Sequence, residues 1–221
     1  MTRLSLPRLL CLAALTLAGG CSALRPAVTP QPAFYALDSG PVPGRAVHPA
    51  APAAPALIVN PSRAASGFDS PRIIYTRADH QLEYFAHSEW VDTPARMLGP
   101  LLVAALERSG SFGSVALTPG TATGDLRLDT EILKFQQEFG LRPSQVHFVL
   151  RAYLVDNRTR RVLASREFDG RVAATSEDAY GGVGAANVLV QDVLVQLAAF
   201  CADAARNWQP RVADDIKQPR R

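Results

Sequence analysis

Residues 125–172 read DLRLDTEILKFQQEFGLRPSQVHFVLRAYLVDNRTRRVLASREFDGRV, and this stretch decides the fold. Its apolar and polar side chains alternate, most regularly over residues 145–156. Alternation with a period of two predicts strands that each bury one face. A polar turn at residues 157–160 separates the last two runs, so the stretch predicts an antiparallel meander of three long strands. The phase of the alternation shifts near Ile132, which predicts a β-bulge.

Helical patterns lie on both sides of this meander in the sequence. The first predicted helix begins after Thr93, a residue type that caps helix N-termini, and ends before Gly110. The second has an apolar stripe at helical spacing and runs from about Ser176 or Gly184 to Asn207. Each helix therefore offers one apolar face that can cover the meander.

Short strand patterns account for the rest of the predicted sheet. They lie at residues 34–37, 57–59, 72–77, 81–86 and 114–117. The third and fourth are rich in β-branched and aromatic residues and flank a short turn, which predicts a β-hairpin. Together the elements predict an α+β fold, with a mainly antiparallel sheet and two helices packed on one face in a two-layer sandwich.

The N-terminus of the sequence predicts export. Residues 1–20 carry Arg3 and Arg8 but no acidic residue, and the run from Leu9 to Ala18 has no charge. As a helix that run is ~15 Å long, about half of the ~30 Å hydrocarbon core of a bilayer. It therefore fits a cleaved signal peptide better than a membrane-spanning helix.

The run LAGGC at residues 17–21 resembles a bacterial lipobox, although Ala18 stands where a larger aliphatic residue is usual. We expect cleavage between Gly20 and Cys21 and acylation of Cys21, palmitate included. The alternative is an ordinary secretory signal followed by a chance cysteine. Stable anchoring needs more than one acyl chain, and a triacylated cysteine meets that requirement. Because Ser22 is not the aspartate that favours inner-membrane retention, we expect the outer membrane.

The mature chain divides into a tether, one domain and a tail. Residues 21–33 give the lipidated cysteine and a short Pro-containing tether, residues 34–208 a single α+β domain, and residues 209–221 a polar tail. Within the domain, residues 41–56 are rich in Pro and Ala. They predict a loop, because proline cannot take a regular place in a sheet.

The charge balance excludes a strongly basic nucleic-acid binder. The chain has 23 Lys and Arg against 20 Asp and Glu. Loss of Arg3 and Arg8 with the signal peptide leaves 21 basic against 20 acidic residues. Once Cys21 is acylated, Cys201 has no partner for a disulfide, and its place on the apolar stripe of the last helix predicts a buried thiol.

The sequence carries no motif for catalysis. It has no phosphate-binding loop and no nucleophile elbow. The run GVGAAN at residues 182–187 lacks the third glycine of a dinucleotide-binding loop, so we interpret it as a flexible lead-in to the last helix. The four histidines are dispersed, and we expect His147 on the sheet face opposite the apolar one.

The remaining polar and aromatic candidates favour structural roles. Asp129, Glu131 and Glu138 fit the solvated face of an amphipathic strand. Trp90 fits the core, or a contact that staples the first helix onto the sheet. We therefore predict no catalytic residue, no cofactor site and no metal site, and a binding or assembly module instead of an enzyme.

Residues 73–107, IIYTRADHQLEYFAHSEWVDTPARMLGPLLVAALE, resemble the central signature of the ABC-type transport auxiliary lipoprotein family. The matching positions are Tyr75, Arg77, Leu82, Glu83, Tyr84, Trp90, Pro94, Met97 and Leu98. The run FYALD at residues 34–38 resembles an early strand of the family, and residues 162–168 resemble a late one. The resemblance covers residues 34–205, and the order and spacing of these segments carry it.

The resemblance implies a lipid-anchored, periplasm-facing and non-catalytic auxiliary subunit of an Mce-type ABC transporter for lipids or other hydrophobic solutes. The implied partners are an Mce-domain substrate-binding protein, an ABC permease and an ATPase, and a homo-oligomer is also implied. The alternative is a structural or assembly lipoprotein of the envelope, such as a chaperone or pilotin. A periplasmic hydrolase is disfavoured, because the dispersed histidines offer no clustered catalytic site.

Overall fold

The predicted meander forms the centre of the fold. It consists of β7 (Leu126–Glu138), β8 (Gln145–Asp156) and β9 (Val162–Ala173), which pair antiparallel in that order. The pairing of β7 with β8 shifts register between Ile132 and Lys134, which confirms the predicted bulge.

The structure is a computed structural model that describes residues 31–38, 54–120 and 123–209. The described residues from Pro32 onward form one compact unit. The predicted signal peptide, most of the tether, most of the Pro/Ala-rich loop and nearly all of the tail lie outside the described residues.

The free edge of β7 pairs with three short strands, one after the other. β2 (Ala56–Val59), β3 (Arg63–Ala64) and β4 (Arg72–Thr76) all run parallel to β7. β3 is not predicted from the sequence, because two residues are too few to show an alternating pattern. These parallel pairs make the sheet mixed, although its long pairs are antiparallel.

The predicted hairpin and the outer strands complete the sheet. β5 (Glu83–Trp90) pairs antiparallel with β4, which confirms the hairpin. β1 (Ala33–Tyr35) runs parallel to β5, and β6 (Ser114–Leu117) runs parallel to β2. β1 is therefore an edge strand of the sheet, and it begins at the residue where the predicted tether ends.

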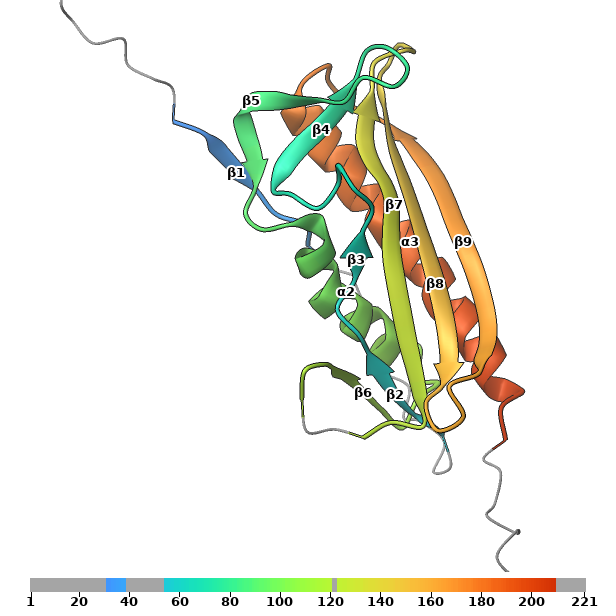
Figure 1. Ribbon diagram of the computed structural model, residues 1–221. Helices are drawn as coiled ribbons and strands as arrows, with labels where there is room; N and C mark the ends of the chain where they lie inside the picture. Colours follow the sequence, from blue (N-terminus) through green and yellow to red (C-terminus); the bar gives the residue numbers. More distant parts are fainter. Residues whose placement is uncertain (1–30, 39–53, 121–122, 210–221) are drawn as a thin grey trace, which may run out of the picture. The chain divides into compact units, whose positions relative to one another are not determined.

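Two helices form the second layer, α2 (Pro94–Arg108) and α3 (Ala179–Arg206) (Figure 1). α3 packs against β8 and β9, and α2 packs against β2, β6 and α3. The alternate side chains of β8 that the sequence assigns to the apolar face are all buried: Val146, Phe148, Leu150, Ala152 and Leu154. The α+β fold with two helices on one face of a mainly antiparallel sheet is confirmed.

The N-terminus of α3 differs from the prediction in a way that the contacts explain. Asp178 caps the helix by accepting a hydrogen bond from the Gly181 N–H at 2.8 Å. Residues 182–187 therefore lie inside α3, and their interpretation as a flexible lead-in is wrong. The glycine at position 182 serves the close approach of α3 to β7, since a Cβ there would lie 2.2 Å from Oε1 of Gln137.

The composition of α3 suits either a core helix or a membrane span. The helix has 28 residues and a mean hydropathy of 1.6 over its most apolar window, of which 56% is buried within the domain. Because that buried side covers the sheet, α3 is the principal core helix of the described domain.

Candidate functional site

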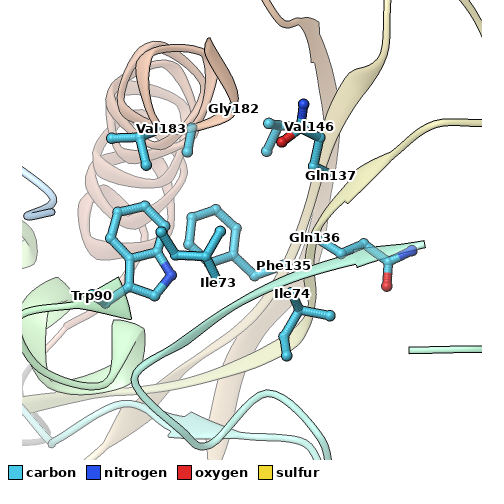
Figure 2. A pocket seen from close by; sticks show the side chains of 10 residues that line it. Ile73, Ile74, Trp90, Phe135, Gln136, Gln137, Val146, Gly182 and Val183 are labelled. Carbon is cyan, nitrogen blue, oxygen red and sulfur yellow. The ribbon is translucent and has the colours of Figure 1, made fainter. Parts of the chain in front are cut away.

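A small crevice lies where the first turns of α3 cross the ends of β4 and β7. Figure 2 shows Trp90, Phe135 and Ile73 side by side below Gly182 and Val183 of α3. The indole of Trp90 stacks on the ring of Phe135 with 5.7 Å between centroids. Trp90 is buried, which confirms its predicted place in the core.

One polar side chain, Gln137, enters this apolar crevice. Its Nε2 donates a hydrogen bond to Ser144 Oγ at 2.9 Å, while its buried Oε1 has no partner among the described residues. The crevice has a volume of about 20 Å³. Such a volume admits one water-sized group that could donate to Oε1, and it is far too small for an acyl chain.

A charged cluster occupies the opposite, open face of the meander. His147 is 3% exposed, and its ring nitrogens lie 2.9 Å from carboxylate oxygens of Glu138 and Asp169. Arg171 completes the cluster, 3.4 Å from Asp169 and 3.7 Å from Glu138. His147, two carboxylates and one guanidinium thus join β7, β8 and β9 on this face.

The cluster changes the ionisation of Glu138. Partial burial alone would raise the pKa of this carboxyl, but hydrogen bonds from His147 and Gln136 outweigh burial and hold the pKa below its ordinary value. His147 lies on the face that the sequence predicts. The expectation of a simply solvated strand face is incomplete, because Glu138, Glu131 and Asp129 are all ion-paired.

The hairpin that carries most of the family-like positions is held by its own contacts. The hydroxyl of Tyr75 donates to Glu83 Oε2 at 2.9 Å, and this bond and burial raise the pKa of Tyr75. Arg77 lies 3.7 Å from the same carboxylate, and Arg72 stacks over the ring of Tyr84 at 4.2 Å. The signature residues of the hairpin therefore help to fix the shape of β4 and β5.

The helical layer adds a shallow groove between the C-terminal half of α2 and α3. It has a volume of about 240 Å³ and is lined mainly by small side chains, among them Ala105, Ala198 and Ala202. Arg108 is the one charged residue in this lining. The groove therefore offers mainly apolar contact area.

The predicted modification site lies in a part of the chain that the structure does not describe. Gly20 and Cys21, the expected cleavage and lipidation positions, lie outside the described residues. Cys201 is fully buried in α3, and burial raises the pKa of its thiol to about 12. Within the described ranges, no group of three or more His, Cys, Asp or Glu side chains could hold a metal ion.

The His147 cluster is the arrangement that sequence reasoning missed. Its carboxylates come from positions nine residues before His147 and 22 residues after it. Only the strand register brings them together, since β8 pairs with β7 on one side and β9 on the other. The sequence pattern indicates only that these residues lie on the polar face of three predicted strands, and it does not show which of them are neighbours.

Comparison with known families now identifies the class of protein. Residues 35–198 match the family described as the ABC-type transport auxiliary lipoprotein component. The chain belongs to this family, as the resemblance of residues 34–205 predicts. The family description associates its members with ABC transport and, as lipoproteins, with the cell envelope.

Solved structures support the fold. Protein XCC0632 from Xanthomonas campestris is similar over 78% of this chain and 96% of its own, with 24% identity and a TM-score of 0.66. An uncharacterized protein is similar over 79% of this chain and 98% of its own, with 16% identity and a TM-score of 0.58. At these identities the likeness concerns the fold alone. No protein with a curated description matches the sequence.

Proposed function

We propose that this chain is a lipid-anchored, periplasm-facing and non-catalytic auxiliary subunit of an Mce-type ABC transporter for lipids or other hydrophobic solutes. Family membership carries the proposal, together with the cysteine that directly follows the signal-like segment. Cys21 is the lipidation residue, and signal cleavage falls between Gly20 and Cys21. Ser22 supports delivery to the outer membrane.

In this role the domain docks a partner, and the crevice beneath α3 is not the place where the solute binds. The crevice beneath α3 admits one water-sized group, and the charged cluster on the sheet is closed by its own ion pairs. The partners are an Mce-domain substrate-binding protein with its permease and ATPase, and further copies of this chain. Acyl chains hold the domain at the membrane with ~0.8 kcal/mol per buried CH₂ group.

Anchoring is tested by substitution of the two cysteines that lie outside the hydrophobic run of the signal. The variant Cys21→Ser loses labelled palmitate and releases the domain from the membrane fraction. The matched control Cys201→Ala keeps both label and membrane association, because the Cys201 thiol is buried in α3. Unchanged palmitate incorporation in Cys21→Ser would refute the assignment of the anchor.

The transport role is tested by affinity capture of the acylated protein from solubilised envelopes. An Mce-domain protein should be recovered with the wild type, and deletion of the chain should impair transport of a lipid or hydrophobic solute. If deletion instead mislocalises an outer-membrane complex and leaves lipid transport intact, the chain is an assembly lipoprotein and the transport proposal fails.

A further inference from the structure

β9 is the longest strand at a free edge of the described sheet. It has 12 residues and pairs with β8 alone among the described strands, whereas the edge strands β1 and β6 have three and four residues. Its sequence contains neither proline nor lysine, two residues that commonly keep such an edge from pairing with another chain. The edge of β9 is therefore a template to which a further strand can be added.

The C-terminal half of β9 directs backbone groups away from the sheet. The Ala174 N–H donates to the Ser144 carbonyl at 2.7 Å, so it points toward β8. Because backbone groups alternate in direction along a strand, those of every second residue from Glu167 to Ala173 point away from β8. All four of these residues are exposed. α3 packs on β8 as well as β9, and it lies behind the sheet and inside the edge along this half of β9 (Figure 1).

The side chains of this half of β9 are complementary to those of a second copy. When two copies pair antiparallel about a twofold axis at Gly170, Asp169 of each copy lies opposite Arg171 of the other. On the helix-covered face, the buried Phe168 lies opposite the partly exposed Val172. Moving the axis by one residue places Asp169 or Arg171 opposite its own copy, where like charges repel. The charges of β9 thus select one register.

Asp169 and Arg171 can serve a second copy without leaving the His147 cluster. Their side chains are 51% and 47% exposed, and the 3.4 Å ion pair between them leaves both accessible on the open face. Gly170 suits the axis, because its missing side chain leaves room for Leu189, whose Cδ1 would lie 2.6 Å from a Cβ built there. The second copy therefore adds ion pairs and backbone hydrogen bonds without disturbing the contact of α3 with β9.

We propose that two copies of this chain pair through the C-terminal halves of β9, antiparallel and centred on Gly170, so that their two sheets become one. The inference deepens the proposed function, which names further copies of this chain as partners, by assigning the surface at which two copies meet. Because each copy uses the same surface, this contact closes at a dimer. It requires neither the anchor at Cys21 nor an Mce-domain protein.

Disulfide cross-linking between two engineered cysteine variants tests the contact and its register. In the proposed register Glu167 lies opposite Ala173 of the other copy, with a Cα separation of about 5.5 Å that a disulfide can span. Full-length Glu167→Cys and Ala173→Cys proteins are purified in detergent, mixed and oxidised, and linked peptides are identified by mass spectrometry. The matched control mixes Ser165→Cys with Ala173→Cys, whose Cα atoms would lie about 9 Å apart. Cys201 does not compete, since its thiol is buried with a pKa of about 12.

We expect linked peptides from positions 167 and 173 in the first mixture and none in the control mixture. Either variant alone should give no link, because equal positions of the two copies lie far apart in this register. Sedimentation of the wild type should give the mass of a dimer. A monomeric wild type, equal linkage in both mixtures, or an oligomer that links neither pair would overturn the proposal.

A proline on the outward side of β9 checks the contact independently. Ala173→Pro removes an N–H that points away from β8, so the far-UV circular dichroism should stay unchanged while the dissociation constant of the dimer rises. Palmitate labelling and affinity capture do not depend on this contact, so failure of the dimer and failure of the proposed function remain distinguishable. An unchanged dissociation constant in Ala173→Pro would show that two copies meet at another surface.

Discussion

The two faces of the meander are built from alternate residues of the same three strands, yet they are stabilised by different physics. The face toward the helices carries Phe148, Leu150 and Leu154, which are completely buried. The open face carries the cluster of His147 and Asp169 and the ion pairs of Arg151. The first gains free energy from apolar area removed from water, and the second from matched charges on neighbouring strands.

The two faces should therefore differ in how substitutions affect the stability of the domain. Apolar packing is a sum of many contacts and fails when volume is lost, whereas the ion-paired face depends on the ionisation of a few groups. Mutations on the helix-covered face should therefore lower stability at every pH. Mutations on the open face should have smaller effects that depend on pH.

The largest effect is expected for Phe148→Ala. Phe148 is fully buried and contacts the ring of Phe135 with 5.0 Å between centroids. Removing a buried aromatic ring costs about 3–5 kcal/mol of unfolding free energy, because a cavity remains. Urea unfolding followed by circular dichroism measures the loss. The control Val162→Ala, at an exposed site, should cost less than about 0.5 kcal/mol.

The contrast between the faces also explains which features of the fold can be predicted from the sequence. The apolar alternation predicts the strands, the bulge near Ile132 and the face toward the helices, because each signal lies within a few neighbouring residues. The cluster around His147 depends on register between strands far apart in sequence. The close approach of Gly182 to Gln137 depends on the helix position over the sheet, so the same glycine looked like a flexible lead-in.

Two glycines of α3 lie on different sides of the helix. Gly182 faces Gln137 of β7, whereas Gly184 faces outward. Gly182→Ala places a Cβ 2.2 Å from Gln137 Oε1 and should cost about 1–3 kcal/mol by overpacking. Gly184→Ala meets nothing within 4 Å and should stabilise the helix by about 0.5–1 kcal/mol. Denaturant midpoints of the two variants provide the measurement.

A second substitution checks the cause at Gly182. Gln137→Ala removes the obstructing side chain, so the double variant should be less destabilised than the two single costs together imply. Additive costs would show that Gly182→Ala acts through something other than Gln137.

On the open face, His147→Gln tests the charged cluster. The glutamine can donate to one carboxylate only, so we expect a loss of about 1–2 kcal/mol at neutral pH, a moderate value because Asp169 is half exposed. The pKa of Glu138 lies below its ordinary value in the wild type, so its contribution is complete above about pH 5 and disappears as the pH falls through that lowered pKa. Unfolding titrations from pH 7 to pH 3 measure the effect.

The exposed histidine of β5 provides the control for this prediction. His87→Gln changes an exposed side chain of the same residue type outside the cluster, and the stability of this variant should follow that of the wild type at each pH. If His147→Gln keeps the acid dependence of the wild type, the lowered pKa of Glu138 does not come from its hydrogen bond with His147.

The smallest effect is expected where the two layers meet at their far end. Asp156 accepts hydrogen bonds from Trp208 Nε1 at 3.0 Å and from the Thr159 N–H at 2.7 Å, and these bonds lower its pKa to about 2. Trp208→Phe removes the first bond but keeps an aromatic ring after α3. We expect a loss of about 0.5–1 kcal/mol at neutral pH.

The sign of the pH effect makes this last prediction specific. Because the pKa of Asp156 is lowered on folding, its stabilisation is present above its ordinary value of 3.8 and disappears as the pH falls toward about 2. In Trp208→Phe the pKa should rise yet stay below 3.8, since the Thr159 N–H still donates. Carboxyl titration by NMR measures the pKa directly. An unchanged titration of Asp156 would show that Trp208 joins α3 to the sheet by packing alone, and the stability difference between the two proteins should then persist below pH 3.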